Sequence, residues 1–241
     1  TEPLPEPGLS TSGELETGIV TYDGPDEAEL MGYLAYMPGQ TKQPAVIVIQ
    51  EWWGLNEHIK DVARRFAAEG YIALAPDLYH GQVTTEPDEA RKLAMELSMG
   101  DAVGEIQAAM AYLRAQDFAT GQIGIVGFCM GGGLVLQTAV ADTTVGAAVP
   151  FYGQPVSGTE AQQITAPVLS FLGTRDGIPA TAYEAMHSAI ESNGIPNQFQ
   201  LYEGAQHAFF NDTRASYAPE AAGDAWMRTL AWFDEYLSPE N

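Results

Sequence analysis

The stretch from Gly127 to Gly133 reads GFCMGGG, and it decides the fold that we expect for the chain. It lies where an apolar run of strand character, Gln122 to Phe128, meets a helical stretch that continues to about Val140. The pattern is G-x-S-x-G with cysteine in place of serine, and its central residue takes strained backbone angles on a sharp turn. Glycines flank that residue because a Cβ there would collide with the neighbouring strand or helix. The stretch predicts a strand-turn-helix unit with a cysteine at the turn.

The position of Cys129 at the start of a helix has a chemical consequence. The helix dipole and the first backbone amides favour a thiolate at this place and a developing oxyanion beside it. The alternative is a phosphate-binding glycine-rich turn with the cysteine packed inside it. A dinucleotide-binding loop, however, would place G-x-G-x-x-G after the first strand of the fold. The stretch therefore favours a nucleophilic cysteine.

Strands and helices alternate on both sides of this stretch. Apolar runs rich in β-branched residues, such as Ala45 to Gln50, suit strands that are buried on both faces. Gly70 ends the first helical stretch as a C-cap would. The alternation predicts an α/β protein, a single domain with a mostly parallel central sheet and helices on both faces. Strands are expected at 17–22, 30–37, 45–50, 71–75, 122–128, 145–152, 167–172 and 197–202, and helices from Ile59 to Gly70 and at 88–97, 101–116, 130–140, 180–192 and 219–237.

The ends of the chain complete this organisation. The first two strands, joined by the turn-prone segment from Asp23 to Asp26, suggest an antiparallel hairpin at the edge of the sheet. Residues 1–16, acidic and rich in Pro, are expected to form a flexible arm, and residues 17–241 the domain. The final helix carries an apolar stripe formed by Trp226, Leu230, Phe233 and Leu237.

The chain is strongly acidic: its 241 residues hold 32 Asp and Glu against 10 Lys and Arg, a formal net charge of -22. Nucleic acid and anionic membranes are therefore poor partners, since both require a positive surface. No apolar run reaches the roughly 20 residues that a membrane-spanning helix needs. We expect a cytoplasmic protein, a monomer or a small homo-oligomer. An exported form stays open, as does the choice between a salt-adapted and an ordinary acidic enzyme.

A nucleophile on such a turn predicts an acid and then a histidine, each after a later strand. Asp176 follows the seventh expected strand, and His207 follows the last one. The alternative for Asp176 is a turn aspartate before Gly177. Cys129, Asp176 and His207 are therefore the candidate catalytic residues. Surface or capping positions are expected for the other three histidines, His58, His80 and His187.

These three residue types together perform nucleophilic acyl transfer. His207 would let the Cys129 thiol act as a thiolate, and Asp176 would fix the tautomer of the imidazole. The thioester acyl-enzyme would then be hydrolysed by water that His207 activates. No cofactor is expected. No metal site is expected either, because the histidines are scattered and no C-x-x-C or H-x-x-x-H spacing occurs.

With these residues located, the sequence resembles the dienelactone hydrolase family of the α/β-hydrolases from Thr17 to Leu237. Two further stretches carry the resemblance. Gln50 to Asn56 reads QEWWGLN, similar to the family's Q-E-x-x-G-x-N segment, and Ala75 to Tyr79 reads APDLY, as the family does. The resemblance implies an α/β-hydrolase fold and the hydrolysis of a small carboxylic ester or lactone.

The resemblance also implies roles for residues around the cysteine. In the family, the glutamate of the Q-E segment contacts the cysteine and helps switch it between thiol and thiolate, which Glu51 would do here. A buried carboxylate near a thiol raises the cost of a second negative charge, so the resting thiol stays protonated and resists oxidation. The alternative for Glu51 is a surface acid at a strand end. The implied oxyanion donors are the backbone amides of Trp52 and Met130.

The sequence departs from the family at two positions. Well-known members bind the substrate carboxylate with arginines two residues after the tyrosine and four after the catalytic histidine, where this chain has Gly81 and Asn211. Arg175 and Arg214 lie nearby in sequence and stay open as substitutes. In so acidic a chain, the loss removes the obvious means of holding an anion, and a neutral or weakly polar ester or lactone is expected. Aromatic pocket walls are expected, with core positions as the equal alternative, at Trp52, Trp53, Tyr79, Phe209 and Phe210.

Two other functions stay open. One is a catalytically silent α/β-hydrolase fold that serves as a binding module, which the complete set of three residues disfavours. The other is a redox sensor built on Cys129. That hypothesis is weakened because the chain holds a single cysteine and so has no resolving partner for it.

Overall fold

The computed structural model describes residues 14–39 and 42–238. The chain falls into two compact units, Thr1–Ile123 and Gly124–Asn241. The arm expected at residues 1–16 lies outside the described residues except for its last three, and the first strand already begins at Glu16. The single domain expected over residues 17–241 stays a prediction.

Four strands belong to the first unit: β1 (Glu16–Asp23), β2 (Glu29–Tyr36), β3 (Gln43–Ile49) and β4 (Ile72–Pro76), with a one-turn 3-10 helix, η1 (Pro25–Glu27), between β1 and β2. Their spatial order is β1-β2-β4-β3. β1 and β2 form the antiparallel hairpin expected at the edge, with Ile19 opposite Tyr33, and β2 pairs antiparallel with β4. β3 and β4 are parallel, and β3 is almost wholly buried, as its apolar sequence predicts.

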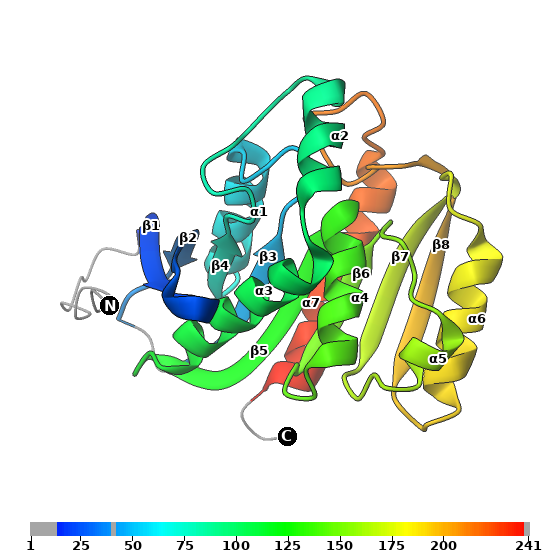
Figure 1. Cartoon of the computed structure of the whole chain (residues 1–241). Coiled ribbons are helices and arrows are strands. Elements are labelled where there is room, and N and C mark those ends of the chain that lie inside the picture. The colour runs from blue at the N-terminus through cyan, green and yellow to red at the C-terminus, as the bar shows by residue number, and fades with distance from the viewer. Residues whose placement is uncertain (1–13, 40–41, 239–241) are drawn as a thin grey trace. The chain divides into compact units, whose positions relative to one another are not determined.

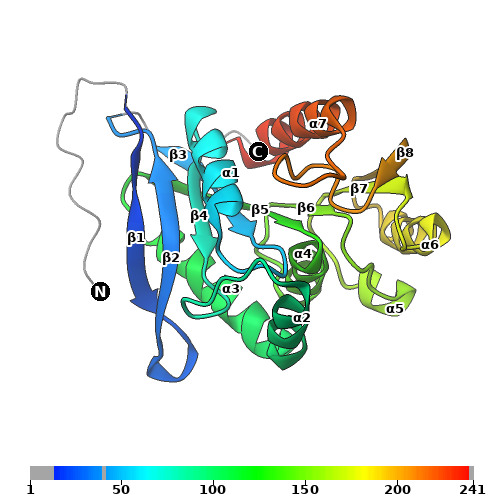
Figure 2. The same ribbon diagram turned by 90° about the horizontal axis from the view of Figure 1, so that it is seen from above.

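Three helices complete the first unit: α1 (Glu57–Ala68), α2 (Pro87–Glu96) and α3 (Met99–Arg114). α1 begins where the Asn56 side chain accepts a hydrogen bond from the Ile59 amide over 3.1 Å. It ends before Gly70, whose φ of +93° is accessible to glycine without strain. α1 and α3 lie on opposite faces of the strands (Figure 2). The predicted positions of all three helices are confirmed to within two residues at every end.

The second unit contains β5 (Ala119–Phe128, which begins just before the unit boundary), β6 (Ala147–Phe151), β7 (Val168–Arg175) and β8 (Asn197–Gln206), with helices α4 (Met130–Ala141), α5 (Gly158–Ala161), α6 (Ala180–Glu191) and α7 (Pro219–Leu237). The strands are parallel throughout, in the order β5-β6-β7-β8 (Figure 1). α4 and α7 lie on opposite faces of these strands (Figure 2). The α/β class with mostly parallel pairing is therefore confirmed.

α7 packs closely against β5 through part of the expected stripe. At Gly124 of β5, a Cβ would lie 2.7 Å from the ring of Phe233 and 2.8 Å from Leu237, so glycine makes room for the helix. Trp226 and Leu230 of the expected stripe are only partly buried. Phe233 and Leu237 of the stripe are buried, and so are Ala222, Ala225, Thr229 and Trp232.

No helix among the described residues has both the length and the hydropathy that a membrane span requires.

Two of the three histidines expected at the surface are buried. His58 is 5 % exposed and His187 is 7 % exposed, so the prediction of a surface position was wrong for both. His80 lies at the surface and pairs with Glu105. His187 on α6 is buried because two polar side chains from β7 and β8 satisfy its ring. Its Nε2 lies 2.9 Å from Ser170 Oγ, and its Nδ1 lies 2.8 Å from Asn197 Oδ1.

The His187 network predicts acid sensitivity of the second unit. Burial lowers the pKa of His187 below its usual 6.5, although the hydrogen bond to Asn197 acts in the opposite direction. The folded protein therefore binds a proton at this site less readily than the unfolded chain. The stabilisation is complete above the unfolded pKa near 6.5 and is lost as the pH falls below it.

We expect the free energy of unfolding to fall between pH 7 and pH 5 more steeply in the wild type than in His187→Gln. Denaturant titrations at several pH values, followed by circular dichroism, measure both slopes. The variant serves as the control for the many carboxylates that titrate in the same range. Equal slopes in the two proteins would contradict a buried, neutral His187.

Candidate active site

Cys129 stands at the sharp turn that the sequence predicts between β5 and α4. Its φ of +56° and ψ of −116° are strained for a residue with a side chain. The turn is held by a hydrogen bond of 3.0 Å from the Cys129 amide to the Phe151 carbonyl oxygen at the end of β6. The cysteine is partly exposed and belongs to no disulfide. A Cβ at Gly132 would lie 2.6 Å from the same Phe151 oxygen, which explains the glycine there.

Asp176 and His207 meet at the ends of β7 and β8. Asp176 Oδ2 lies 2.9 Å from His207 Nδ1, and Asp176 Oδ1 accepts a hydrogen bond from the Ile178 amide over 3.1 Å. The Asp176 side chain is 1 % exposed, whereas that of His207 is 43 % exposed. A carboxylate oxygen can only accept here, so His207 Nδ1 carries a proton and donates it to Asp176. His207 Nε2 is then the nitrogen available for Cys129, with which His207 also hydrogen-bonds.

The surroundings of His207 determine its charge. Partial burial lowers its pKa, but the hydrogen bonds to Asp176 and to Cys129, and the charges of both, outweigh this effect and raise the pKa to about 10. Beside Asp176 and a charged Cys129, His207 is therefore an imidazolium at neutral pH. An imidazolium between a cysteine and a buried carboxylate is suited to hold a thiolate and to protonate a leaving group.

Gly173 allows β7 and β8 to approach closely enough for Asp176 and His207 to meet. A Cβ at Gly173 would overlap the carbonyl oxygen of Ala205 on β8. Directly beyond this contact the register shifts, so that Gly173 pairs with Tyr202 but Arg175 pairs with Gln206. Between these two pairs lie three residues of β8 but only one of β7, so β8 bulges at this point. The role of Gly173 could not be predicted from the sequence, because only the approach of the other strand reveals it.

Gly173→Ala should therefore damage the site without touching any of its three side chains. The new methyl group pushes the end of β8 away from β7, and displacement of a catalytic group by about 1 Å typically costs about 10²-fold in turnover. Steady-state kinetics on a short-chain ester measure the effect. Gly177→Ala is the matched control, because a Cβ at Gly177 meets nothing within 4 Å. Equal activity of the two variants would contradict this role of Gly173.

The residues of the Q-E segment lie in the first unit. Glu51 is only 1 % exposed, so the structure excludes the surface acid that the sequence left open. The rings of Trp52 and Trp53 pack edge to face with centroids 5.0 Å apart. The segment contacts the loop after β4, since the Thr84 amide donates to the Trp53 carbonyl oxygen over 3.1 Å. The roles expected for Glu51 and for the amides of Trp52 and Met130 stay predictions.

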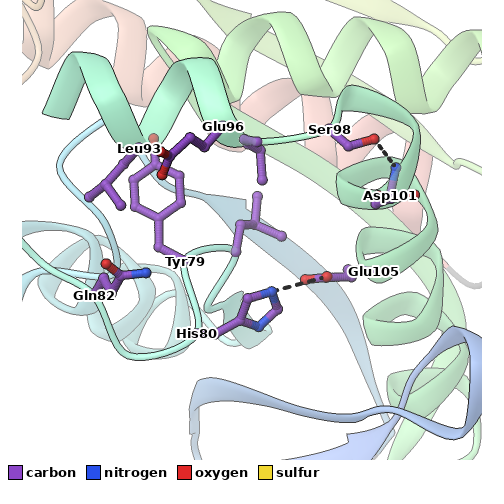
Figure 3. Close-up of a pocket in the computed structure, with 10 residues that line it drawn as sticks. Tyr79, His80, Gln82, Leu93, Glu96, Ser98, Asp101 and Glu105 are labelled. Carbon is purple, nitrogen blue, oxygen red and sulfur yellow. Dashed lines mark hydrogen bonds and ion pairs between the residues drawn. The ribbon is translucent and has the colours of Figure 1, made fainter.

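Tyr79 lines a cavity of about 220 Å³ in the first unit. Its ring points toward Leu93 and Glu96 of α2, as Figure 3 shows. On the other side of the cavity, His80 Nε2 lies 3.4 Å from Glu105 Oε1 of α3. Tyr79 is itself 4 % exposed, so it presents little area to a ligand.

Phe209 and Phe210, the other aromatic residues expected to line a pocket, lie in the core of the second unit. They are 0 % and 3 % exposed. The ring of Phe210 stacks on that of Phe128 directly before the cysteine, with centroids 5.0 Å apart. The structure thus places both at the core positions that the sequence left open as the alternative. Their rings pack in the core next to the site of Cys129 and His207 and offer little surface to a substrate.

The two positions where the family carries arginines have local structural roles here. The Gly81 amide donates to Asp77 Oδ2 over 2.7 Å, and its φ is +90°. Asn211 is fully buried, and its side-chain oxygen accepts from the Thr213 amide over 3.0 Å. Arg175, which lies nearby in sequence, is exposed. Both departures are therefore accommodated by the fold.

A strained cysteine after β5, an acid after β7 and a histidine after β8 are the arrangement that defines an α/β-hydrolase. The comparison with known proteins gives the family. A model of the dienelactone hydrolase family matches residues 30–237, and the chain belongs to that family.

Curated relatives and solved structures agree with this placement. A Synechocystis protein named "Putative carboxymethylenebutenolidase" is 35% identical over 93% of this chain and 98% of its own. "Protein usf" of Aquifex pyrophilus is 37% identical over 81% of this chain and 89% of its own. The crystal structure of a Klebsiella pneumoniae dienelactone hydrolase, itself assigned provisionally, has a TM-score of 0.83 at 31% identity and covers 92% of this chain and 100% of that one. The protein is thus a hydrolase of this family.

Proposed function

We propose that this protein hydrolyses small, neutral carboxylic esters or lactones through Cys129, His207 and Asp176. The observation that carries the proposal is the arrangement of His207. One ring nitrogen is held 2.9 Å from a buried carboxylate, and the ring also hydrogen-bonds to a cysteine on a strained strand-to-helix turn. This sequence of acid, base and nucleophile is the one that acyl transfer requires.

Acylation begins from a Cys129 thiolate beside the His207 imidazolium. The sulfur attacks the acyl carbon and forms a carbon-sulfur bond, while the carbonyl electrons move onto the oxygen. When the carbonyl re-forms, the carbon-oxygen bond to the alcohol breaks, and His207 Nε2 gives its proton to the departing alkoxide. The products of this step are the free alcohol, a Cys129 thioester and a neutral His207.

Deacylation reverses the direction of proton transfer. Neutral His207 removes a proton from water, and the resulting hydroxide attacks the thioester carbon. Collapse of the second tetrahedral intermediate expels the Cys129 thiolate and releases the carboxylic acid, which leaves His207 as imidazolium again. Asp176 stays ionised throughout and holds the ring in one tautomer. The contributions of Glu51 and of the Trp52 and Met130 amides are proposed from the family resemblance.

The preference for a neutral substrate follows from the distribution of charge. The positions of the family's two carboxylate-binding arginines hold Gly81 and Asn211, and the net charge of the chain is -22. In the described part of the second unit, Arg228 is paired with Asp224 over 2.6 Å, and Arg175 is exposed. A carboxylated substrate would therefore meet a repulsive field, and the positions of the family's two arginines supply no cation to hold it.

A substrate panel tests the proposal. The purified enzyme is assayed with neutral short-chain p-nitrophenyl esters, with esters that carry a free carboxylate, and with neutral and carboxylated lactones, each in low and high salt. We expect turnover of the neutral members, with a burst of p-nitrophenol before the steady state. High salt should increase the turnover of the anionic substrates, because it screens their repulsion by the acidic protein. A preference for anionic substrates in low salt would overturn the substrate class, and no turnover of any member would favour a silent binding module.

A further inference from the structure

Tyr152, the residue directly after β6, has an unusual backbone conformation. Its φ is +38°, a value that residues with side chains rarely adopt. In the described part of the second unit, positive φ values outside glycine occur at Cys129, at Tyr152 and at Ala208, the neighbour of His207. Such a strained conformation persists only where the contacts around it hold it in place, and strained residues are concentrated at functional sites. Tyr152 therefore shares this signature with the nucleophile and with the residue that follows the base.

Contacts from several elements hold the backbone around Tyr152. The Tyr152 amide donates to the Phe171 carbonyl oxygen of β7 over 2.8 Å. The next carbonyl oxygen, that of Gly153, accepts a hydrogen bond of 2.6 Å from the hydroxyl of Tyr183 on α6. A Cβ at Gly153 would overlap the backbone of Gly132 in the first turn of α4, so glycine is required at this contact. The turn is therefore fixed against β7, α6 and the helix that follows the cysteine.

The result of this conformation is a fully buried ring beneath the exposed imidazole. Tyr152 is 0 % exposed, and its ring packs edge to face on His207 with centroids 5.1 Å apart at 62°. The Tyr152 ring also packs against Phe209, with centroids 5.3 Å apart at 71°. Because Phe209 is itself fully buried, this contact belongs to the core and restricts the movement of the Tyr152 ring.

His207 needs such a support for a geometric reason. The hydrogen bond between its Nδ1 and Asp176 fixes a single atom of the ring, and the ring could still swing about that bond. A swing would move Nε2 away from the cysteine while leaving the bond to Asp176 intact. The edge of a rigid aromatic ring against the imidazole removes this freedom.

We propose that Tyr152 is a positioning residue that holds the imidazole of His207 in the orientation in which Nε2 faces Cys129. The proposal rests on the proposed function, in which His207 moves protons to and from the substrate. The ring of Tyr152, rather than its hydroxyl, performs this role. The strained turn after β6 brings that ring against the imidazole of His207.

Two substitutions separate the ring from the hydroxyl. Tyr152→Phe keeps the ring, and we expect kcat within about twofold of the wild type. Tyr152→Leu keeps an apolar side chain but removes the ring, and we expect kcat to fall by about 10²-fold with KM little changed, because orientation rather than binding is lost. Equal damage by both variants would overturn the proposal in favour of the hydroxyl. Unchanged kcat in a folded Tyr152→Leu protein would overturn it altogether.

A substrate-free measurement distinguishes this proposal from the proposed function. In ¹⁵N-histidine-labelled protein, the pKa of His207 should stay near the wild-type value in Tyr152→Phe and fall in Tyr152→Leu, because the hydrogen bond to Cys129 that raises it is lost. This result stands even if the enzyme turns over no ester. Should the leucine variant fail to fold, the wild type and the phenylalanine variant still decide. Both proteins must show nuclear Overhauser contacts between the protons of the aromatic ring at position 152 and the imidazole protons of His207. The absence of these contacts would contradict the proposal.

Discussion

Replacement of Cys129 by alanine is expected to abolish the burst of p-nitrophenol and to lower kcat/KM for a short-chain ester by at least about 10⁴-fold. The reason is that the sulfur forms the covalent bond of the first step, and no other side chain of the site can take its place. Stopped-flow and steady-state assays measure the two quantities. Because the residue is only partly buried, alanine leaves the fold intact, which a thermal melt verifies.

Cys129→Ser is the matched control for this substitution. Serine keeps a nucleophilic atom on the same strained turn, but a hydroxyl gives up its proton far less readily than a thiol. We expect its activity to lie between those of the alanine variant and the wild type. Wild-type activity in Cys129→Ala would place the chemistry elsewhere in the molecule.

The second large effect is expected from Asp176→Asn, with a fall in kcat of about 10⁴-fold. An amide at this position can donate a hydrogen bond to His207 Nδ1, which favours the wrong tautomer and leaves the proton on Nε2. The substitution also removes one of the groups that raise the pKa of His207 to about 10. The imidazolium form, present in the wild type below about pH 10, should then be lost at a lower pH.

An NMR titration of His207 in the wild type and in Asp176→Asn measures this change. Asp234→Asn on the exposed face of α7 alters the net charge equally and serves as the control. If the pKa of His207 is unaffected by Asp176→Asn, or is lowered as much by Asp234→Asn, the 2.9 Å hydrogen bond is not what sets the charge of the base.

Local sequence patterns were sufficient to locate the strands, the α-helices of the described residues except the one-turn α5, and the three residues of the candidate site. The turn at Cys129 depends on its own glycines and on the β5 and α4 sequences beside it. Asp176 and His207 could be placed because parallel strands present their carboxyl ends at one edge. The fold class was predictable for the same reason, since each element shows its own period.

What the sequence did not reveal depends on contacts between distant segments. His187 is polar and lies on a helix, and nothing near it in sequence signals that Ser170 and Asn197 will satisfy its ring. Gly173 and Tyr152 are likewise unremarkable until β8 and the imidazole of His207 lie against them. Strand ends were underestimated too. β7 and β8 continue through polar residues to Arg175 and Gln206, because pairing resumes after the shift in register.

The central claim is that the sulfur of Cys129 carries the acyl group. The most direct test is to mix the enzyme rapidly with excess p-nitrophenyl acetate and to quench the reaction with acid. Mass spectrometry of the intact protein and of its peptides then locates any acetyl group. We expect one added acetyl group, located on the peptide that contains Cys129. It should form as fast as the burst, and neutral hydroxylamine should remove it, as it removes a thioester. An acetyl group on another residue, or turnover without any acetylated protein, would contradict it.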